Sequence, residues 1–80
     1  MISWRALQEM LDACAPAWRF TESDEYYTIY WGDLPPFPRL TRGSHRQRGK
    51  PSAEIHELHV RKLARHFGIL ECAKLHLTLR

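Results

Sequence analysis

The stretch YYTIYWG, residues 26–32, constrains the fold more than any other part of the chain. It is dense in aromatic and β-branched residues, which is typical of a β-strand. Strand alternation divides its side chains between two faces, with Tyr27, Ile29 and Trp31 on one and Tyr26, Thr28 and Tyr30 on the other. Two further segments, AWRFTES at 17–23 and RLT at 39–41, also have strand character. The prolines in LPPFP, which precede RLT, place that third strand at a sheet edge.

Amphipathic segments lie on both sides of these strands. In SWRALQEMLDAC, residues 3–14, Trp4, Leu7, Leu11 and Cys14 recur at helical spacing. Ser3 is suited to cap this helix at its start, and Pro16 ends it.

The second amphipathic segment is ELHVRKLARHFG, residues 57–68. Val60, Leu63, Ala64 and Phe67 share one of its faces. Gly68 is suited to the left-handed position that follows a helix.

This order of elements predicts an α+β fold of order α-β-β-β-α, in which a three-stranded antiparallel sheet carries helices on one face. ILECAKLHLTLR, residues 69–80, can add a short C-terminal helix. With 80 residues, the chain has room for one small domain, 1–80.

Cysteine content and hydropathy indicate the expected environment. Cys14 and Cys72 are too few for a disulfide framework, so both are expected to be reduced thiols, with Cys14 acting as a small core residue. We find no signal-like segment and no apolar run of the roughly 20 residues that a membrane span needs. The chain is therefore expected to be cytoplasmic, with no membrane partner.

Charge is distributed unevenly along the chain. Residues 1–33 contain two basic and six acidic residues, a balance of −4, whereas residues 34–80 contain ten and three, a balance of +7. This asymmetry favours an anionic partner for the second half, although solvated charge that only maintains solubility is the plainer alternative.

The basic stretch RLTRGSHRQRGK, residues 39–50, carries most of this interpretation. Phosphate-binding candidates from this stretch are Arg39, Arg42, Arg46, Arg48 and Lys50, and those from the second helix are Arg61 and Arg65. Tyr26 and Tyr30 offer rings on which bases can stack. Basic charge beside aromatic rings is what single-stranded or irregular RNA requires, so RNA is the expected partner. The alternative is that the rings belong to the core and the arginines to a solvated loop.

Five histidines are the candidates for acid–base or metal chemistry. They lack the paired cysteine spacing of zinc sites, so we expect neither a metal nor another cofactor. Among the basic residues, His45 could act as general acid or base on a ribose 2′-hydroxyl.

The helix SWRALQEMLDAC with AWRF after it, the aromatic strand, and the closing segment GKPSAEIHELHVRKLARHFGI together resemble the HicA family of bacterial toxins. The resemblance covers most of the chain. It implies a double-stranded-RNA-binding-like fold, a metal-independent ribonuclease (mRNA interferase) activity and neutralisation by an antitoxin protein.

The sequence differs from the family's pattern at the catalytic histidine. The family's Gly-Ser-His-like motif aligns with Asp24–Tyr27, which reads DEYY, whereas Gly43-Ser44-His45 comes later. Either His45 supplies the catalytic imidazole from another loop, or the protein binds RNA without cutting it.

Two other functions compete with this hypothesis. VRKLARHFGILECAKLHL, residues 60–77, is similar to the helix-turn-helix of DNA-binding regulators, with Lys74, His76 and Thr78 as groove-reading candidates. A protein-interaction module with an acidic partner is the third hypothesis.

Overall fold

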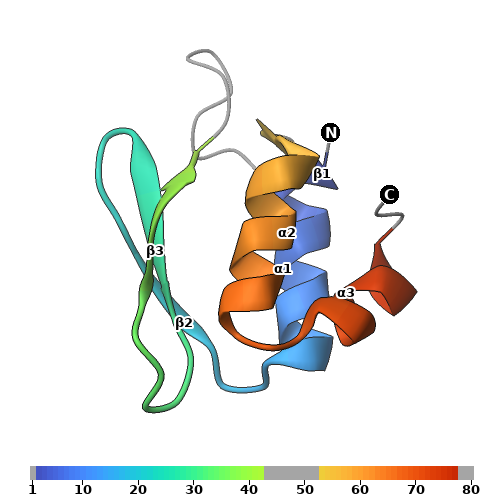
Figure 1. Ribbon diagram of the computed structural model, residues 1–80. Helices are drawn as coiled ribbons and strands as arrows, with labels where there is room; N and C mark the ends of the chain where they lie inside the picture. Colours follow the sequence, from blue (N-terminus) through green and yellow to red (C-terminus); the bar gives the residue numbers. More distant parts are fainter. Residues whose placement is uncertain (1, 43–52, 78–80) are drawn as a thin grey trace.

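The computed structural model describes residues 2–42 and 53–77 (Figure 1). Its elements follow the chain as β1 (Ile2–Ser3), α1 (Trp4–Cys14), β2 (Arg19–Glu22), β3 (Tyr26–Tyr30), β4 (Phe37–Thr41), β5 (Glu54–Ile55), α2 (Glu57–His66) and α3 (Leu70–His76). The predicted α+β class is confirmed, with three helices in the described part. The additional C-terminal helix is α3.

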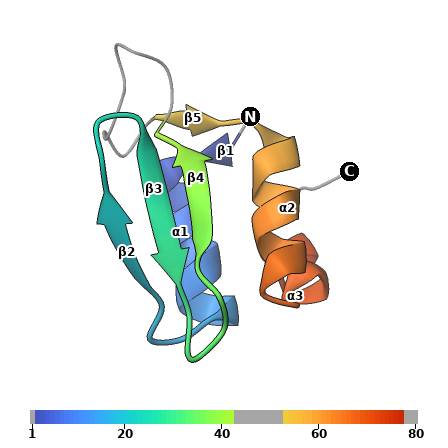
Figure 2. The same cartoon turned by 60° about the vertical axis from the view of Figure 1, so that its left-hand side comes forward.

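Strands β2, β3 and β4 form an antiparallel sheet with β3 in the centre, which confirms the prediction. Helices α1 and α2 lie on one side of this sheet, and α3 contacts both of them (Figures 1 and 2). No helix of the described part crosses the other side of the sheet. That uncovered side is called the outer sheet face below.

The helix ends follow their local sequence signals. The Ser3 side chain accepts a hydrogen bond from the Ala6 amide at 3.1 Å, as expected of an N-cap. Gly68 follows α2 with φ of +70°, a conformation that costs glycine little because it has no Cβ. At the start of α2, the Nδ1 atom of His56 accepts from the Leu58 amide at 3.1 Å, a cap the sequence analysis did not predict.

The core lies between the sheet and the helices. Tyr27 and Ile29 are buried, whereas Tyr26, Thr28 and Tyr30 are not, as the alternation predicted. The residues that meet them from the rest of the chain include Leu7 and Leu11 of α1, Leu40 of β4, and Val60, Leu63 and Ala64 of α2. Fully burying one such aliphatic side chain contributes about 1.5–3 kcal/mol.

A second, two-stranded pairing was not predicted. β1 pairs antiparallel with β5, with Ile2 opposite Ile55, and the Trp4 amide donates to the Ala53 carbonyl at 2.8 Å. This pairing ties the start of α1 to the start of α2, since each strand lies directly before its helix.

Within residues 2–42 and 53–77, no helix has the length and apolar character needed to cross a bilayer.

Candidate nucleic-acid interface

Strand register assigns the side chains of the outer sheet face. Arg19 pairs with Tyr30, and Thr21 pairs with Thr28, so all four point to the side of the sheet away from the core. Tyr26 joins them by alternation along β3 and is 38% exposed. The result is a surface of hydroxyl groups and aromatic rings with a cation at one end.

Arg19 and Tyr30 form a stacked pair on this face. The Arg19 guanidinium lies over the Tyr30 ring, 5.7 Å from its centroid. The Tyr30 hydroxyl lies 3.4 Å from the Thr21 hydroxyl, which fixes the other end of the ring. An arginine that stacks on a ring uses the face of its guanidinium, so the N–H groups at the edge can still donate to a phosphate.

Arg39 is placed by an irregularity in β4. Leu40 pairs with Tyr27 and Phe37 pairs with Ile29, so Pro38 and Arg39 together lie opposite Thr28. Two residues opposite one make a β-bulge, a feature that re-aims side chains. Arg39 has φ of +61°, is exposed, and has no charge partner among the described residues. It can therefore bind a phosphate without losing an internal contact.

Arg42, a predicted phosphate-binding residue, makes several contacts within the fold. Its guanidinium lies 2.8 Å from the Glu22 carboxylate and donates to the Ser23 carbonyl. It also lies over the Tyr27 ring at 5.2 Å, and only 17% of its side chain is exposed. These contacts connect the end of β4 to the end of β2, across β3. Arg42 therefore holds the sheet together through these contacts, and its phosphate contact stays a prediction.

Arg61 and Arg65 are separated from the outer sheet face. Both belong to α2, which lies on the opposite side of the sheet. Arg61 Nε is 3.9 Å from the Glu57 carboxylate, whereas Arg65 is exposed and has no charge partner in the described part of the chain. The predicted Arg61/Arg65 face therefore lies on a different side of the fold from Tyr26 and Tyr30.

Four predicted site residues, His45, Arg46, Arg48 and Lys50, lie outside the described residues. Of the histidines that the structure describes, His56 caps α2 and His66 lies 2.6 Å from the Pro35 carbonyl. None of the described histidines lies on the outer sheet face, because they belong to α2, its N-cap and α3.

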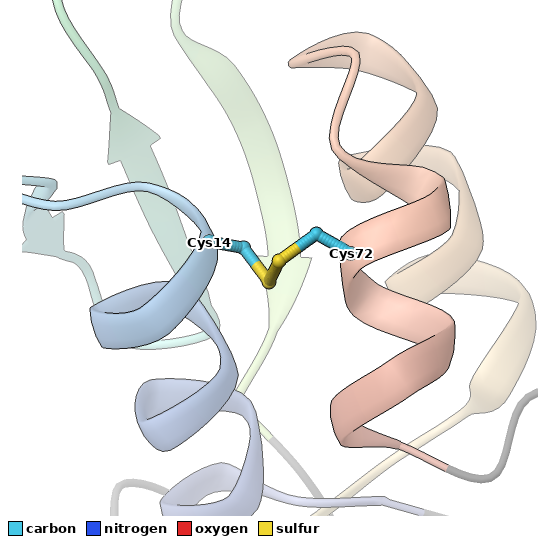
Figure 3. Close-up of a disulfide and its surroundings, with 2 residues drawn as sticks. All are labelled: Cys14 and Cys72. Carbon is cyan, nitrogen blue, oxygen red and sulfur yellow. A yellow bond between two sulfur atoms is a disulfide. The ribbon is translucent and has the colours of Figure 1, made fainter.

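The two cysteines are joined in a disulfide, which corrects the expectation of reduced thiols. Cys14 at the end of α1 and Cys72 in α3 have Cα atoms 5.8 Å apart, and Figure 3 shows the bridge between the two helices. A nitrogen of the His76 ring and the two sulfur atoms lie within 4.8 Å of one another. Because 58 residues separate the cysteines, only the tertiary fold reveals this cluster.

Helices α2 and α3 are consecutive, as the helix-turn-helix hypothesis expects. However, α3 has only seven residues, and its Lys74 lies 3.7 Å from Glu71. The disulfide also attaches this helix to α1. The outer sheet face is therefore the better candidate for a nucleic-acid site.

In comparisons with known proteins, no family model, no curated protein and no solved structure matches the chain.

Proposed function

We propose that the protein binds single-stranded or irregular RNA on its outer sheet face. The observation that carries the proposal is the stacked Arg19–Tyr30 pair, which lies on a sheet face that no described helix covers. A ring and a cation side by side match the two parts of a nucleotide, the base and the phosphate.

Each group on the face has a role in this proposal. Tyr26 is the exposed ring on which a base stacks, an interaction of about 1–3 kcal/mol per base. Arg19, opposite Tyr30 in β2, and Arg39, opposite Thr28 in β4, donate to phosphates from the two strands that flank β3. Thr28 lies between them in the central strand, and its hydroxyl can bond a ribose 2′-hydroxyl. The strongly positive balance of residues 34–80 supports the same partner class.

The resemblance to HicA toxins extends the proposal to catalysis and regulation. In that extension, His45 transfers a proton during cleavage of the RNA, and an antitoxin protein covers the binding surface. A three-stranded antiparallel sheet, β2-β3-β4, that follows α1 and precedes α2 supports this comparison. Binding does not depend on this extension, because RNA can be bound on the sheet whether or not it is cut.

Salt dependence of binding tests the proposal. A fluorescein-labelled, mixed-sequence, single-stranded RNA is titrated at several salt concentrations with native protein and with Arg19→Ala, Arg39→Ala and Tyr26→Ala. Each arginine substitution should reduce the slope of log affinity against log salt by about 0.7. Tyr26→Ala should weaken binding with the slope unchanged, because stacking involves no charge.

Arg5→Ala is the matched control, since Arg5 is an exposed arginine on α1, on the opposite side of the sheet. An equal slope change in Arg5→Ala would mean that binding depends on overall charge and would reject the outer sheet face as the site. Competition with an acidic peptide separates RNA binding from the protein-interaction hypothesis. A peptide that displaces RNA at equal charge concentration would favour an acidic protein partner.

A further inference from the structure

We propose that Cys14, Cys72 and His76 form a Zn²⁺ site when the disulfide is reduced. Both sulfur atoms and one His76 ring nitrogen already lie within 4.8 Å of one another. Two thiolates and an imidazole are ligands that zinc favours. This proposal does not depend on RNA binding, since the cluster lies among the helices and not on the outer sheet face.

Helix geometry explains why the three groups converge. Cys72 and His76 are four residues apart in α3, so they lie on the same face of that helix, one turn apart. Cys14 is the last residue of α1 and faces Cys72 from the neighbouring helix (Figure 3). Two rigid elements thus supply all three ligands, and no rearrangement of the fold is needed to assemble them.

The reduced side chains can reach the spacing of a tetrahedral ion. With Zn–S near 2.3 Å and Zn–N near 2.0–2.1 Å, neighbouring ligand atoms lie about 3.3–3.8 Å apart. Side-chain rotation can bring the three atoms to this spacing once the sulfur atoms are no longer bonded. Both cysteines are half-buried and His76 is exposed, so solvent can reach the ion from the His76 side. A water molecule would complete the coordination there.

The chemistry requires a reductant, for which a small-molecule thiol suffices. Two thiol molecules deliver two electrons and two protons, the S–S bond breaks, Cys14 and Cys72 become thiols, and the reductant becomes a disulfide. Zn²⁺ then displaces the two thiol protons and binds both sulfur atoms as thiolates. The connection between α1 and α3 is covalent in the oxidised protein and metal-mediated in the reduced one.

Cobalt and zinc titrations test the site on the full chain. The protein is first reduced. Reductant and metal are then removed under oxygen-free conditions, and the protein is titrated with Co²⁺. We expect thiolate-to-cobalt charge-transfer absorption and the visible bands of tetrahedral cobalt at one equivalent, both abolished by one equivalent of Zn²⁺. Oxidised protein should give neither signal. Circular dichroism before and after reduction establishes that the reduced chain is folded.

Single substitutions assign the ligands. His76→Ala should weaken Zn²⁺ binding at least tenfold, whereas His59→Ala, which removes a histidine outside the cluster, should leave it unchanged. Cys14→Ser should remove most of the charge-transfer absorption, and the reduced chain without substitutions should release two protons for each zinc bound. The proposal is overturned if reduced, folded protein shows no thiolate–cobalt absorption. It is equally overturned if His76→Ala binds zinc as tightly as the native chain does.

Discussion

The indole ring of Trp4 stacks on the phenol ring of Tyr27, with centroids 3.9 Å apart and planes within 8° of parallel. Trp4 is the first residue of α1 and Tyr27 is in the central strand, so this contact joins the two layers of the fold. Phe20 meets both rings edge-on. The stack is thus the centre of an aromatic cluster.

This stack should couple the two residues energetically. In a double-mutant cycle of Trp4→Leu and Tyr27→Leu, we expect a coupling of about 0.5–1.5 kcal/mol in the free energy of unfolding. Urea denaturation of the four proteins measures it. Trp31→Leu with Tyr27→Leu is the control cycle, because the Trp31 ring contacts Phe67 instead. Equal coupling in both cycles would contradict a specific role for the stack.

Arg42 should matter for stability and not for RNA contact. Arg42→Ala removes the Glu22 ion pair and the bond to the Ser23 carbonyl, and we expect a loss of about 1–2 kcal/mol in the free energy of unfolding. Half of the Glu22 side chain is exposed, which limits the contribution of the ion pair. Arg39→Ala is the comparison: because Arg39 is exposed, this substitution should change the free energy of unfolding by less than about 0.5 kcal/mol. A flattened RNA salt slope in folded Arg42→Ala would show that Arg42 binds phosphate after all.

The disulfide should contribute substantially to stability. Closing a segment of 58 residues lowers the entropy of the unfolded chain, which corresponds to about 4 kcal/mol in the chain-entropy treatment. Reduction in the presence of a chelator should therefore lower the urea midpoint strongly. The double variant Cys14→Ser, Cys72→Ser should resemble the reduced protein and should not respond to reductant. A midpoint that reduction leaves unmoved would contradict the structural importance of the bridge.

Ala17 offers a stabilising substitution. It connects α1 to β2 with φ of +68°, a left-handed conformation that costs a residue with a Cβ about 1–2 kcal/mol. Ala17→Gly relieves this cost but increases the entropy of the unfolded chain, so we expect a net gain of about 0.5–1 kcal/mol in thermal or urea unfolding. Ala6→Gly, inside α1, is the control and should destabilise by about 1 kcal/mol.

The catalytic extension is tested by cleavage of a labelled single-stranded RNA in the presence of a chelator. Native protein should cut the RNA, His45→Ala should bind without cutting, and His59→Ala should retain activity. Cleavage by folded His45→Ala would exclude His45 as the acid or base. If native protein binds the RNA and leaves it intact, the cleavage hypothesis is wrong and the proposed function is RNA binding alone.

Local signals explain why much of the fold could be predicted. The alternation of residues 26–30, the Ser3 cap and the Gly68 turn depend on neighbours within a few positions, so they can be read directly from the sequence. The site was harder to predict. Tyr26 and Tyr30 were placed correctly on one face because alternation is local, whereas the separation of Arg61 and Arg65 from that face depends on where α2 lies against the sheet.

The features that were missed all depend on long-range contacts. Nothing near Cys14 indicates Cys72, and two-residue strands such as β1 and β5 have no periodicity of their own. The internal contacts of Arg42 are a further example, since a basic residue in a basic stretch gives no sign that Glu22 and Ser23 accept from its guanidinium. Only the three-dimensional arrangement shows which arginines make structural contacts.

The pairing of Ile2 with Ile55 has a consequence for how the protein forms during synthesis. β5 and α2 are synthesised about 50 residues after β1 and α1. When β1 and α1 leave the ribosome, β1 therefore has no strand to pair with, and the apolar face of α1 is not yet covered by α2. Contacts of such high sequence separation form slowly, and the unpaired apolar surface is prone to aggregation in the meantime. Slowing translation should therefore prolong the vulnerable state of this chain, and a chaperone that covers α1 should improve its yield.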